Sequence, residues 1–383
     1  DFLIAVNYNL NTTSTRRANA IAFDVREKGR PMREGNSVDG KPLKDANGNT
    51  IMQPGTLKST KAIGWYIDEY GIAQVSMNIT NINVTPLHVA FDEVCRAAAA
   101  RGVRVTGAEI VGLMPKRVLL DAGRHYLEMQ QRSVGIPEDD IIQIAIKSMS
   151  LDQLKPFCPK EKVIEMLLEA DDDTQKLVDL SVKAFTEETS RESPAPGGGT
   201  IAACMGAMGA ALGTMVANLS AHKRGWDERW EEFSRWAEKG QALQSRLLRL
   251  IDDDTAAFNE IMAAFGMPKS NDEEKTLRSA AIQTATLHAA QVPLETMKTA
   301  FEAFALCKAM AENGNPNSIS DAGVGALAIR AAVRGACMNV KINASSLKDR
   351  SLAEPLIAEA DRIAEEADRE EAAITSFINA RLV

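Results

Sequence analysis

The most distinctive chemistry-bearing string in the chain is Ser-Pro-Ala-Pro-Gly-Gly-Gly-Thr at residues 193–200. Two prolines stiffen the approach, and three glycines allow backbone amides to face a ligand at the beginning of a helix, where an anion is favoured. The lysine of a GxxxxGK[ST] phosphate loop is absent, which disfavours nucleotide binding. We expect substrate contacts at Pro196, Gly197, Gly198 and Gly199, although the same string also fits a flexible helix cap.

A second set of polar residues lies further along the chain. Asn339 and Asn343 are four residues apart and share a helix face, where they can hold a polar ligand or satisfy one another. Asp321 follows Ser320 at an expected helix start, so it is either a capping acid or an acid with a chemical role. Asp252 and Asp254 belong to a run of three acids that is either a favourable charge at a helix start or a source of a carboxylate.

Composition limits the classes of partner. The 383 residues include 44 Lys and Arg against 52 Asp and Glu, a net charge of −8, which argues against nucleic acid or an anionic membrane as the main partner. The five cysteines are scattered without a CxxC pair or metal-ligand spacing, so we expect a cytoplasmic protein without a metal. They are Cys95, Cys158, Cys204, Cys307 and Cys337.

One stretch has the length of a membrane span. Residues 201–219 contain no charge, but Gly206, Gly209 and Gly213 fall on one helical face that another helix can approach closely. We therefore expect a buried helix of a soluble bundle rather than a membrane span.

The elements expected in residues 1–168 alternate between strand and helix. Apolar periodicity predicts a strand at 2–9, a helix at 14–28, a hairpin at 62–68 and 73–79, a helix at 86–101 and a strand at 103–111. This βαββαβ order predicts an α+β, ferredoxin-like subdomain with helices on one face of an antiparallel sheet. Two further helices are expected at 115–130 and 139–147, and an exposed Gly-containing excursion at 33–55.

The acidic string EADDD places a linker at residues 169–174, and an all-α helical bundle is expected over 175–383. Breaks at proline, glycine or capping residues separate its predicted helices. These are 177–188, 200–219, 226–265, 273–288, 294–313, 321–343 and 353–382.

Several of these strings together resemble the formiminotransferase-cyclodeaminase family. In the second half the resemblance rests on SPAPGGGT, DDDTAAFNEIMAAFGMPK (252–269), VPLET (292–296), NPNSISD (315–321) and GACMNVKIN (335–343). In the first half it rests on FLIAVNYNL (2–10), IGWYIDE (63–69), AQVSMN (73–78) and the Leu87-His88 helix. The resemblance implies the C-terminal subdomain of glutamate formiminotransferase followed by a complete cyclodeaminase domain.

The resemblance implies a folate enzyme of histidine breakdown that closes 5-formimino-tetrahydrofolate to 5,10-methenyl-tetrahydrofolate and releases ammonia. This chemistry needs a positioned acid/base rather than a metal or nicotinamide. Asp321 is the first choice for the acid/base or for stabilising the cationic amidinium and methenyl groups, with Asn339 and Asn343 holding the pterin. Asp252 and Asp254 are the runner-up carboxylates. Tetrahydrofolate is the carrier, and a polyglutamate tail would need cations such as Lys269.

Lys223, Arg224 and Arg334 are the other candidates for such a cationic strip. The family also implies N-formimino-glutamate as a substrate of the complete transferase and a homo-oligomer built from dimers, in many members an octamer.

One departure from the family is expected to matter. The transferase of the family has an N-terminal subdomain that carries its catalytic histidine, and the chain begins at Asp1, without Met, where the second subdomain would begin. We therefore expect transferase activity only in a longer protein, and treat His88 and His125 as structural. Two other functions remain open: a methenyl-tetrahydrofolate cyclohydrolase, and a non-catalytic oligomerising scaffold.

Overall fold

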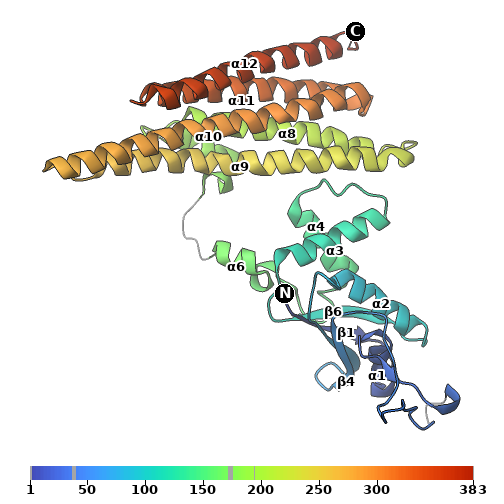
Figure 1. Ribbon diagram of the computed structural model, residues 1–383. Coiled ribbons are helices and arrows are strands. Elements are labelled where there is room, and N and C mark those ends of the chain that lie inside the picture. The colour runs from blue at the N-terminus through green and yellow to red at the C-terminus, as the bar shows by residue number, and fades with distance from the viewer. Residues whose placement is uncertain (1, 37–39, 171–175, 194, 383) are drawn as a thin grey trace. The chain divides into compact units, whose positions relative to one another are not determined.

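The chain forms two compact units (Figure 1), and the computed structural model describes residues 2–36, 40–170, 176–193 and 195–382. The first unit consists of Asp1–Gln130 and Pro137–Asp173, and the second of Gln131–Ile136 and Thr174–Val383. Most of the expected linker at 169–174 lies outside the described residues. The assignment of Gln131–Ile136 to the second unit is an arrangement that the sequence did not suggest.

The segment Gln131–Ile136 is tied to the second unit by hydrogen bonds. The Val134 amide donates to Ser234 Oγ at 3.1 Å, and Asn218 Nδ2 donates to the Gly135 carbonyl at 2.8 Å. A Cβ atom on Gly135 would lie 2.3 Å from the Ala237 Cβ atom, so only glycine permits this approach.

An antiparallel sheet of four strands organises the first unit, in the order β4-β5-β1-β6. Its strands are β1 (Ile4–Leu10), β4 (Thr60–Ile67), β5 (Ile72–Ile79) and β6 (Val105–Val111). The short strands β2 (Arg30–Pro31) and β3 (Met52–Gln53) pair within the expected excursion. The coarse prediction of an antiparallel sheet region followed by a helix-rich part is confirmed.

The helices of the first unit bury one face of this sheet. Val6, Tyr8 and Leu10 alternate along β1 and are fully buried, and the Tyr8 ring lies 6.1 Å from the ring of Phe91. Phe91 belongs to α2, and α1 covers Gly64 of β4. The helices are α1 (Thr15–Val25), α2 (Leu87–Ala99), α3 (Lys116–Met129), α4 (Glu138–Ser148), α5 (Pro159–Lys162) and α6 (Ile164–Ala170).

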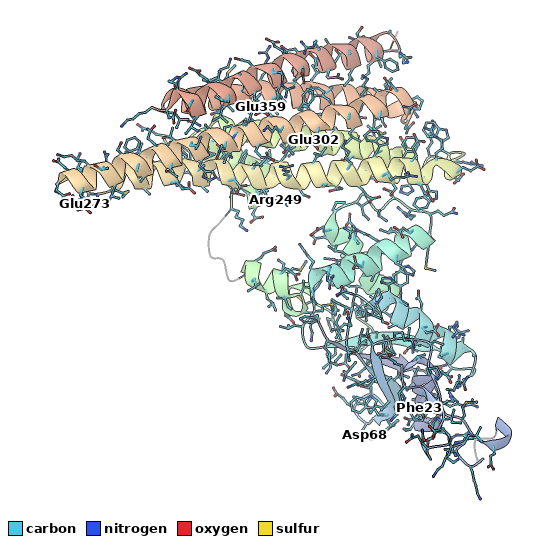
Figure 2. All side chains as sticks on the ribbon, viewed as in Figure 1. Phe23, Asp68, Arg249, Glu273, Glu302 and Glu359 are labelled. Carbon is cyan, nitrogen blue, oxygen red and sulfur yellow. The ribbon has the colours of Figure 1, made fainter. Side chains whose placement is uncertain are left out.

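The second unit is built from helices, of which the five longest lie side by side (Figure 1). Its helices are α7 (Val182–Thr189), α8 (Gly198–Ala221), α9 (Trp230–Gly266), α10 (Asp272–Asn313), α11 (Ile319–Ser345) and α12 (Arg350–Asn379). Alanine dominates the core, which lets the helices pack closely. Charged side chains such as Arg249 and Glu302 are exposed on the outer faces of α9 and α10 (Figure 2).

The predicted break in the helix at VPLET is wrong, because α10 continues through Pro293. Proline lacks the N–H that would bond the carbonyl four residues earlier, and this usually breaks a helix. Here Asn343 of α11 donates its Nδ2 to the Ala289 carbonyl at 2.6 Å. The side chain of a neighbouring helix thus satisfies the acceptor that Pro293 leaves free.

The glycine face of α8 packs inside the bundle, as predicted. A Cβ on Gly209 would lie 2.7 Å from Ile329 Cγ1 and 2.8 Å from the Gly325 carbonyl of α11, and a Cβ on Gly213 would lie 2.8 Å from Leu306 Cγ of α10. The helix is long and apolar enough to cross a membrane, but 61% of its most hydrophobic window is buried inside the protein. Burial by neighbouring helices accounts for its composition.

Candidate functional site

The beginning of α8 meets the middle of α9 through a partly buried carboxylate. Thr200 donates its Oγ1 hydrogen to Asp254 Oδ2 at 2.8 Å, and the Gly197 amide donates to Thr200 Oγ1 at 3.3 Å. The Thr200 amide also donates to the Asp254 carboxylate. Asp254 therefore satisfies donors that the first turn of α8 would otherwise leave unpaired.

The approach of this carboxylate requires glycine on α8. A Cβ atom on Gly199 would collide with Asp254 Oδ1 at 2.1 Å. Burial raises the pKa of Asp254, and the two hydrogen bonds from Thr200 oppose that rise. A carboxyl group with a raised pKa takes up a proton more readily than an ordinary aspartate, which favours a role as general acid/base.

Asn339 comes to the same place from α11. A Cβ on Gly198 would lie 3.2 Å from Asn339 Nδ2, and that amide group donates to the Gly335 carbonyl of its own helix at 2.9 Å. The structure therefore brings together Gly198, Gly199, Asp254 and Asn339. Thr200, which the sequence reasoning did not select, is the residue that links the glycine string to the carboxylate.

Asn343 has a structural partner in place of the predicted ligand. Asn343 Nδ2 donates to the Ala289 carbonyl, which has no backbone donor because of Pro293. Asn339 lies one turn earlier on α11, opposite Gly198. The two amides do not bond one another. The string VPLET, together with a later asparagine, was the available signal for this contact, but their pairing depends on how α10 and α11 pack.

The expectation that Asp321 shares a cleft with the glycine string and the asparagines is wrong for this chain. Asp321 lies in the first turn of α11, and Asn339 follows eighteen residues later on the same unbroken helix. At about 1.5 Å per residue, the two are about 27 Å apart along the helix axis. The string NPNSISD begins a long helix, and nothing in its local pattern reveals that length.

Asp252 makes a hydrogen bond within the protein, and Lys269 lies beyond the end of α9. Asp252 Oδ1 accepts from the Leu177 amide at 2.7 Å, and the run of three acids lies in the middle of α9 rather than at its beginning. Lys269 is exposed beyond the end of α9, about 18 Å along the axis from the level of Asp254. Its contact with a polyglutamate tail stays a prediction.

The other candidates for the cationic strip lie apart from the glycine string in the described part of the chain. Lys223 and Arg224 follow the end of α8, about 35 Å along the axis from the glycine string. The Lys223 ammonium lies 4.0 Å from the centre of the Trp226 ring, and Arg334 forms an ion pair with Asp368.

The first unit carries a polar cluster that the sequence reasoning missed. On the sheet face opposite Tyr8, Asn9 Nδ2 donates to Gln153 Oε1 and Gln74 Nε2 donates to Asn9 Oδ1, both at 2.7 Å. Asn9 and Gln74 are fully buried, and Gln74 Oε1 has no partner among the described residues. The alternation of Asn7 and Asn9 with apolar residues along β1 was the available signal.

The histidines of the first unit pack against one another. The rings of His88 and His125 stack at 4.4 Å, and His125 Nε2 lies 3.1 Å from Asp92 Oδ2. Within the described ranges, no group of three or more His, Cys, Asp or Glu is placed to hold a metal ion. All five cysteines are free.

Two family models match the chain. The model described as "Formiminotransferase domain" matches residues 5–169, and the model described as "Formiminotransferase-cyclodeaminase" matches residues 181–362. The formiminotransferase domain is present, so the expectation that the chain lacks the N-terminal catalytic part of the transferase is not supported.

Individual relatives agree with these matches. Formimidoyltransferase-cyclodeaminase of Rattus norvegicus is 34% identical over 99% of this chain, and the chain spans 66% of the length of that relative. Methenyltetrahydrofolate cyclohydrolase of Methylorubrum extorquens is 41% identical over 49% of this chain and 90% of its own. A crystal structure of formiminotetrahydrofolate cyclodeaminase from Thermotoga maritima matches with a TM-score of 0.49 and 26% identity, over 54% of this chain and 100% of that chain. The chain belongs to the formiminotransferase-cyclodeaminase family.

Proposed function

We propose that the second unit closes 5-formimino-tetrahydrofolate to 5,10-methenyl-tetrahydrofolate with loss of ammonia. The observation that carries this proposal is the position of Asp254, a largely buried carboxyl group held by Thr200 at the glycine-rich start of α8 and close to Asn339. Family membership supplies the folate chemistry, and the geometry supplies the residue that would move the proton.

The reaction transfers one proton between two nitrogens of the substrate. N10 attacks the carbon of the protonated formimino group, –CH=NH2+, which becomes tetrahedral and carries the amino group that will depart. Asp254 takes the proton from N10 and returns it to that amino nitrogen, so that the carbon–nitrogen bond breaks and ammonia leaves. The carboxylate is regenerated, and the remaining N5–C–N10 group carries the positive charge of the methenyl product.

The residues around Asp254 would orient the folate. The Gly198 and Gly199 amides at the beginning of α8 favour a group with negative charge, and Asn339 offers an amide to the pterin. Asn343 acts indirectly, because its contact with Ala289 fixes α10 against α11.

A second candidate is hydrolysis of 5,10-methenyl-tetrahydrofolate. It is favoured by the similarity to the cyclohydrolase of Methylorubrum extorquens, of which the chain spans 90%. Both reactions pass through a tetrahedral carbon held between N5 and N10, so the same carboxylate would serve either. They differ in the leaving group, which is ammonia in ring closure and the N5 nitrogen of the folate when hydrolysis leaves a formyl group on N10.

Separate assays of the two folates distinguish these candidates. We expect ammonia release from 5-formimino-tetrahydrofolate to exceed hydrolysis of 5,10-methenyl-tetrahydrofolate, and Asp254→Asn to lower kcat by roughly 10²-fold or more. Asp253→Asn is the matched control, since Asp253 is an exposed neighbour on the same helix. Full activity of Asp254→Asn would exclude Asp254 as the acid/base.

The first unit is proposed to serve formimino transfer from N-formimino-glutamate to tetrahydrofolate. Its support is the match to a formiminotransferase domain and the buried polar cluster of Asn9, Gln74 and Gln153. The ferredoxin-like assignment is part of the proposal: the order β4-β5-β1-β6 places the first and third of the four strands at the centre.

A homo-oligomer built from dimers remains part of the proposal. Large apolar side chains are exposed on two helices of the second unit, namely Met208 at 53% on α8, and Leu327 at 50%, Met338 at 70% and Ile342 at 67% on α11. Contiguous exposed apolar residues favour association. Sedimentation of the chain would report whether a dimer is the smallest species.

A further inference from the structure

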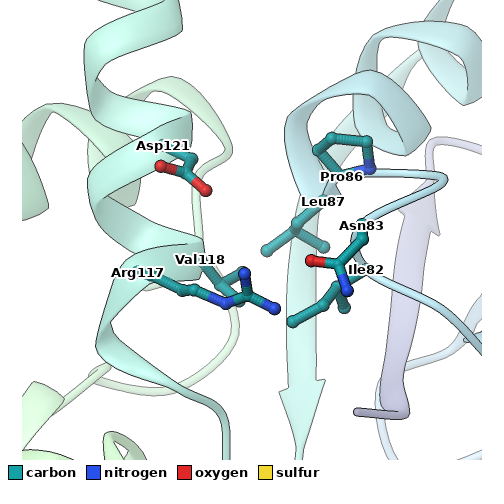
Figure 3. A pocket seen from close by; sticks show the side chains of 7 residues that line it. All are labelled: Ile82, Asn83, Pro86, Leu87, Arg117, Val118 and Asp121. Atoms are coloured by element: carbon teal, nitrogen blue, oxygen red, sulfur yellow. The ribbon is translucent and has the colours of Figure 1, made fainter. Parts of the chain in front are cut away.

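A cavity of about 230 Å³ lies in the first unit between the beginning of α2 and the beginning of α3 (Figure 3). Its apolar wall consists of Ile82, Leu87 and Val118, which are at most 6% exposed. This lining comes from the helix side of the unit, whereas the polar cluster around Asn9 lies on the opposite face of the sheet. The cavity is therefore separate from the groups assigned to formimino transfer.

Two opposite charges line the same cavity without neutralising one another. Arg117 and Asp121 are four residues apart on α3, a spacing at which an arginine and an aspartate can form an ion pair. Among the described residues Arg117 has no ion pair, and Asp121 lies 3.8 Å from a different cation, Arg124. Figure 3 shows the Arg117 guanidinium reaching across the cavity toward Asn83, away from Asp121.

The start of α2 adds to the positive side of this cavity. Pro86 occupies the N-cap position and provides no side-chain hydrogen bond to the first turn. The free amides there carry the partial positive charge of a helix N-terminus. One part of the cavity wall thus favours an anion, while Asp121 favours a cation.

The size of the cavity limits its ligand. Cavities that hold drug-sized molecules have volumes of about 300–1,000 Å³, so a space of 230 Å³ suits a smaller metabolite. We propose that this cavity binds an α-amino acid with a short aliphatic side chain. Its carboxylate pairs with Arg117, its ammonium group pairs with Asp121, and its side chain lies on Ile82, Leu87 and Val118.

The pKa of His88 should report whether the cavity holds a ligand, because His88 directly follows Leu87 of the cavity wall. Burial and His125 lower the pKa of His88, whereas the charges of Asp92 and Asp121 oppose that shift. A ligand ammonium group paired with Asp121 would weaken the effect of that carboxylate on the pKa of His88. Binding should therefore lower the pKa of His88 further.

Three probes that share the same isobutyl group test the proposal on the full chain. L-Valine carries both charges, isovalerate carries only the carboxylate, and isobutylammonium carries only the ammonium group. Calorimetry should show valine binding at least about tenfold more tightly than either single-charge probe, because only valine forms both ion pairs. Histidine NMR titrations with and without valine should show the fall in the pKa of His88.

Variants complete the test. Arg117→Gln and Asp121→Asn should each reduce valine affinity to that of a single-charge probe, while Arg104→Gln, an exposed arginine outside the cavity, should leave it unchanged. Circular dichroism and thermal melting establish that the variants are folded. Absence of valine binding, equal affinity for valine and isovalerate, or undiminished binding by folded Arg117→Gln would each overturn the proposal. None of these measurements depends on folate turnover.

Discussion

At the scale of single residues, the contact between Thr200 and Asp254 determines how the proposed acid/base titrates. Burial alone would favour the neutral carboxyl group, and the two hydrogen bonds from Thr200 favour the charged one. The pKa of Asp254 is the result of these opposing effects. A change in one hydrogen bond should therefore change the pH at which the enzyme becomes active.

Replacing Thr200 with valine tests this balance. Thr200→Val removes the 2.8 Å hydrogen bond to Asp254 Oδ2, so the pKa of Asp254 should rise further. If the charged carboxylate accepts the N10 proton, the acid limb of kcat/KM should move to higher pH. Thr200→Ser keeps the hydroxyl and should restore the original limb. An unchanged limb in a folded Thr200→Val variant would contradict the role of Asp254 as the base.

Asn343 offers a second test, on stability rather than turnover. Asn343→Ala leaves the buried Ala289 carbonyl without a donor, which should lower the free energy of unfolding by roughly 1–3 kcal/mol. Pro293→Ala supplies the missing backbone N–H, so Asn343→Ala should cost clearly less in that background. Urea unfolding of the wild type, both single variants and the double variant gives the coupling energy. Additive effects would show that the asparagine does not replace the bond lost at proline.

At the scale of elements, periodicity predicted the strands of the sheet and most helices of the second unit, because these patterns follow directly from which side faces the core. The hairpin of β4 and β5 and the helix α11 show this agreement. The break at Pro293 was predicted wrongly, since the local effect of proline is reversed by a distant side chain. The composition of the glycine string was enough to select it as part of the candidate site. Its partner Asp254 could be selected only as a second choice for the acid/base.

The placement of Asp321 shows the same limit for the site. Asp321 lies far from Asn339 because α11 is one unbroken helix. This helix runs antiparallel to α8, since Gly209 of α8 lies opposite Ile329 and Gly198 lies opposite Asn339. The strings NPNSISD and GACMNVKIN both carry the family resemblance, but they lie at different levels along the bundle. A sequence pattern identifies the residues, whereas the packing of helices decides which of them meet.

The close packing of α8 against α11 predicts the effect of a larger side chain. Gly209→Leu would place atoms where Ile329 Cγ1 and the Gly325 carbonyl lie within 2.8 Å of the added Cβ. We expect a loss of roughly 1–3 kcal/mol in the free energy of unfolding, because backbone cannot move aside as a flexible side chain can. Gly266→Ala is the control, since a Cβ there meets nothing within 4 Å. Equal stability of Gly209→Leu and wild type would show that this packing is not tight.

At the scale of the whole molecule, the proposed function assigns a different reaction to each of the two compact units. Each unit matches its own family model, and each has its own buried core. The first would attach the formimino group to tetrahydrofolate, and the second would close the resulting folate. The proposed acid/base Asp254 belongs to the second unit, as do Thr200 and Asn339.

This division predicts that the two reactions can be separated by a single substitution. Asp254→Asn should block ring closure while the rate of formimino transfer stays equal to that of the unsubstituted chain, since no described group of the first unit's polar cluster changes. With N-formimino-glutamate and tetrahydrofolate supplied together, 5-formimino-tetrahydrofolate should then accumulate instead of the methenyl product. Chromatography of the folates over time, with Asp253→Asn in parallel, measures both rates. If Asp254→Asn lowered transfer and ring closure to the same extent, the two units could not be independent catalysts, and the carboxylate would have to support the structure of the whole chain.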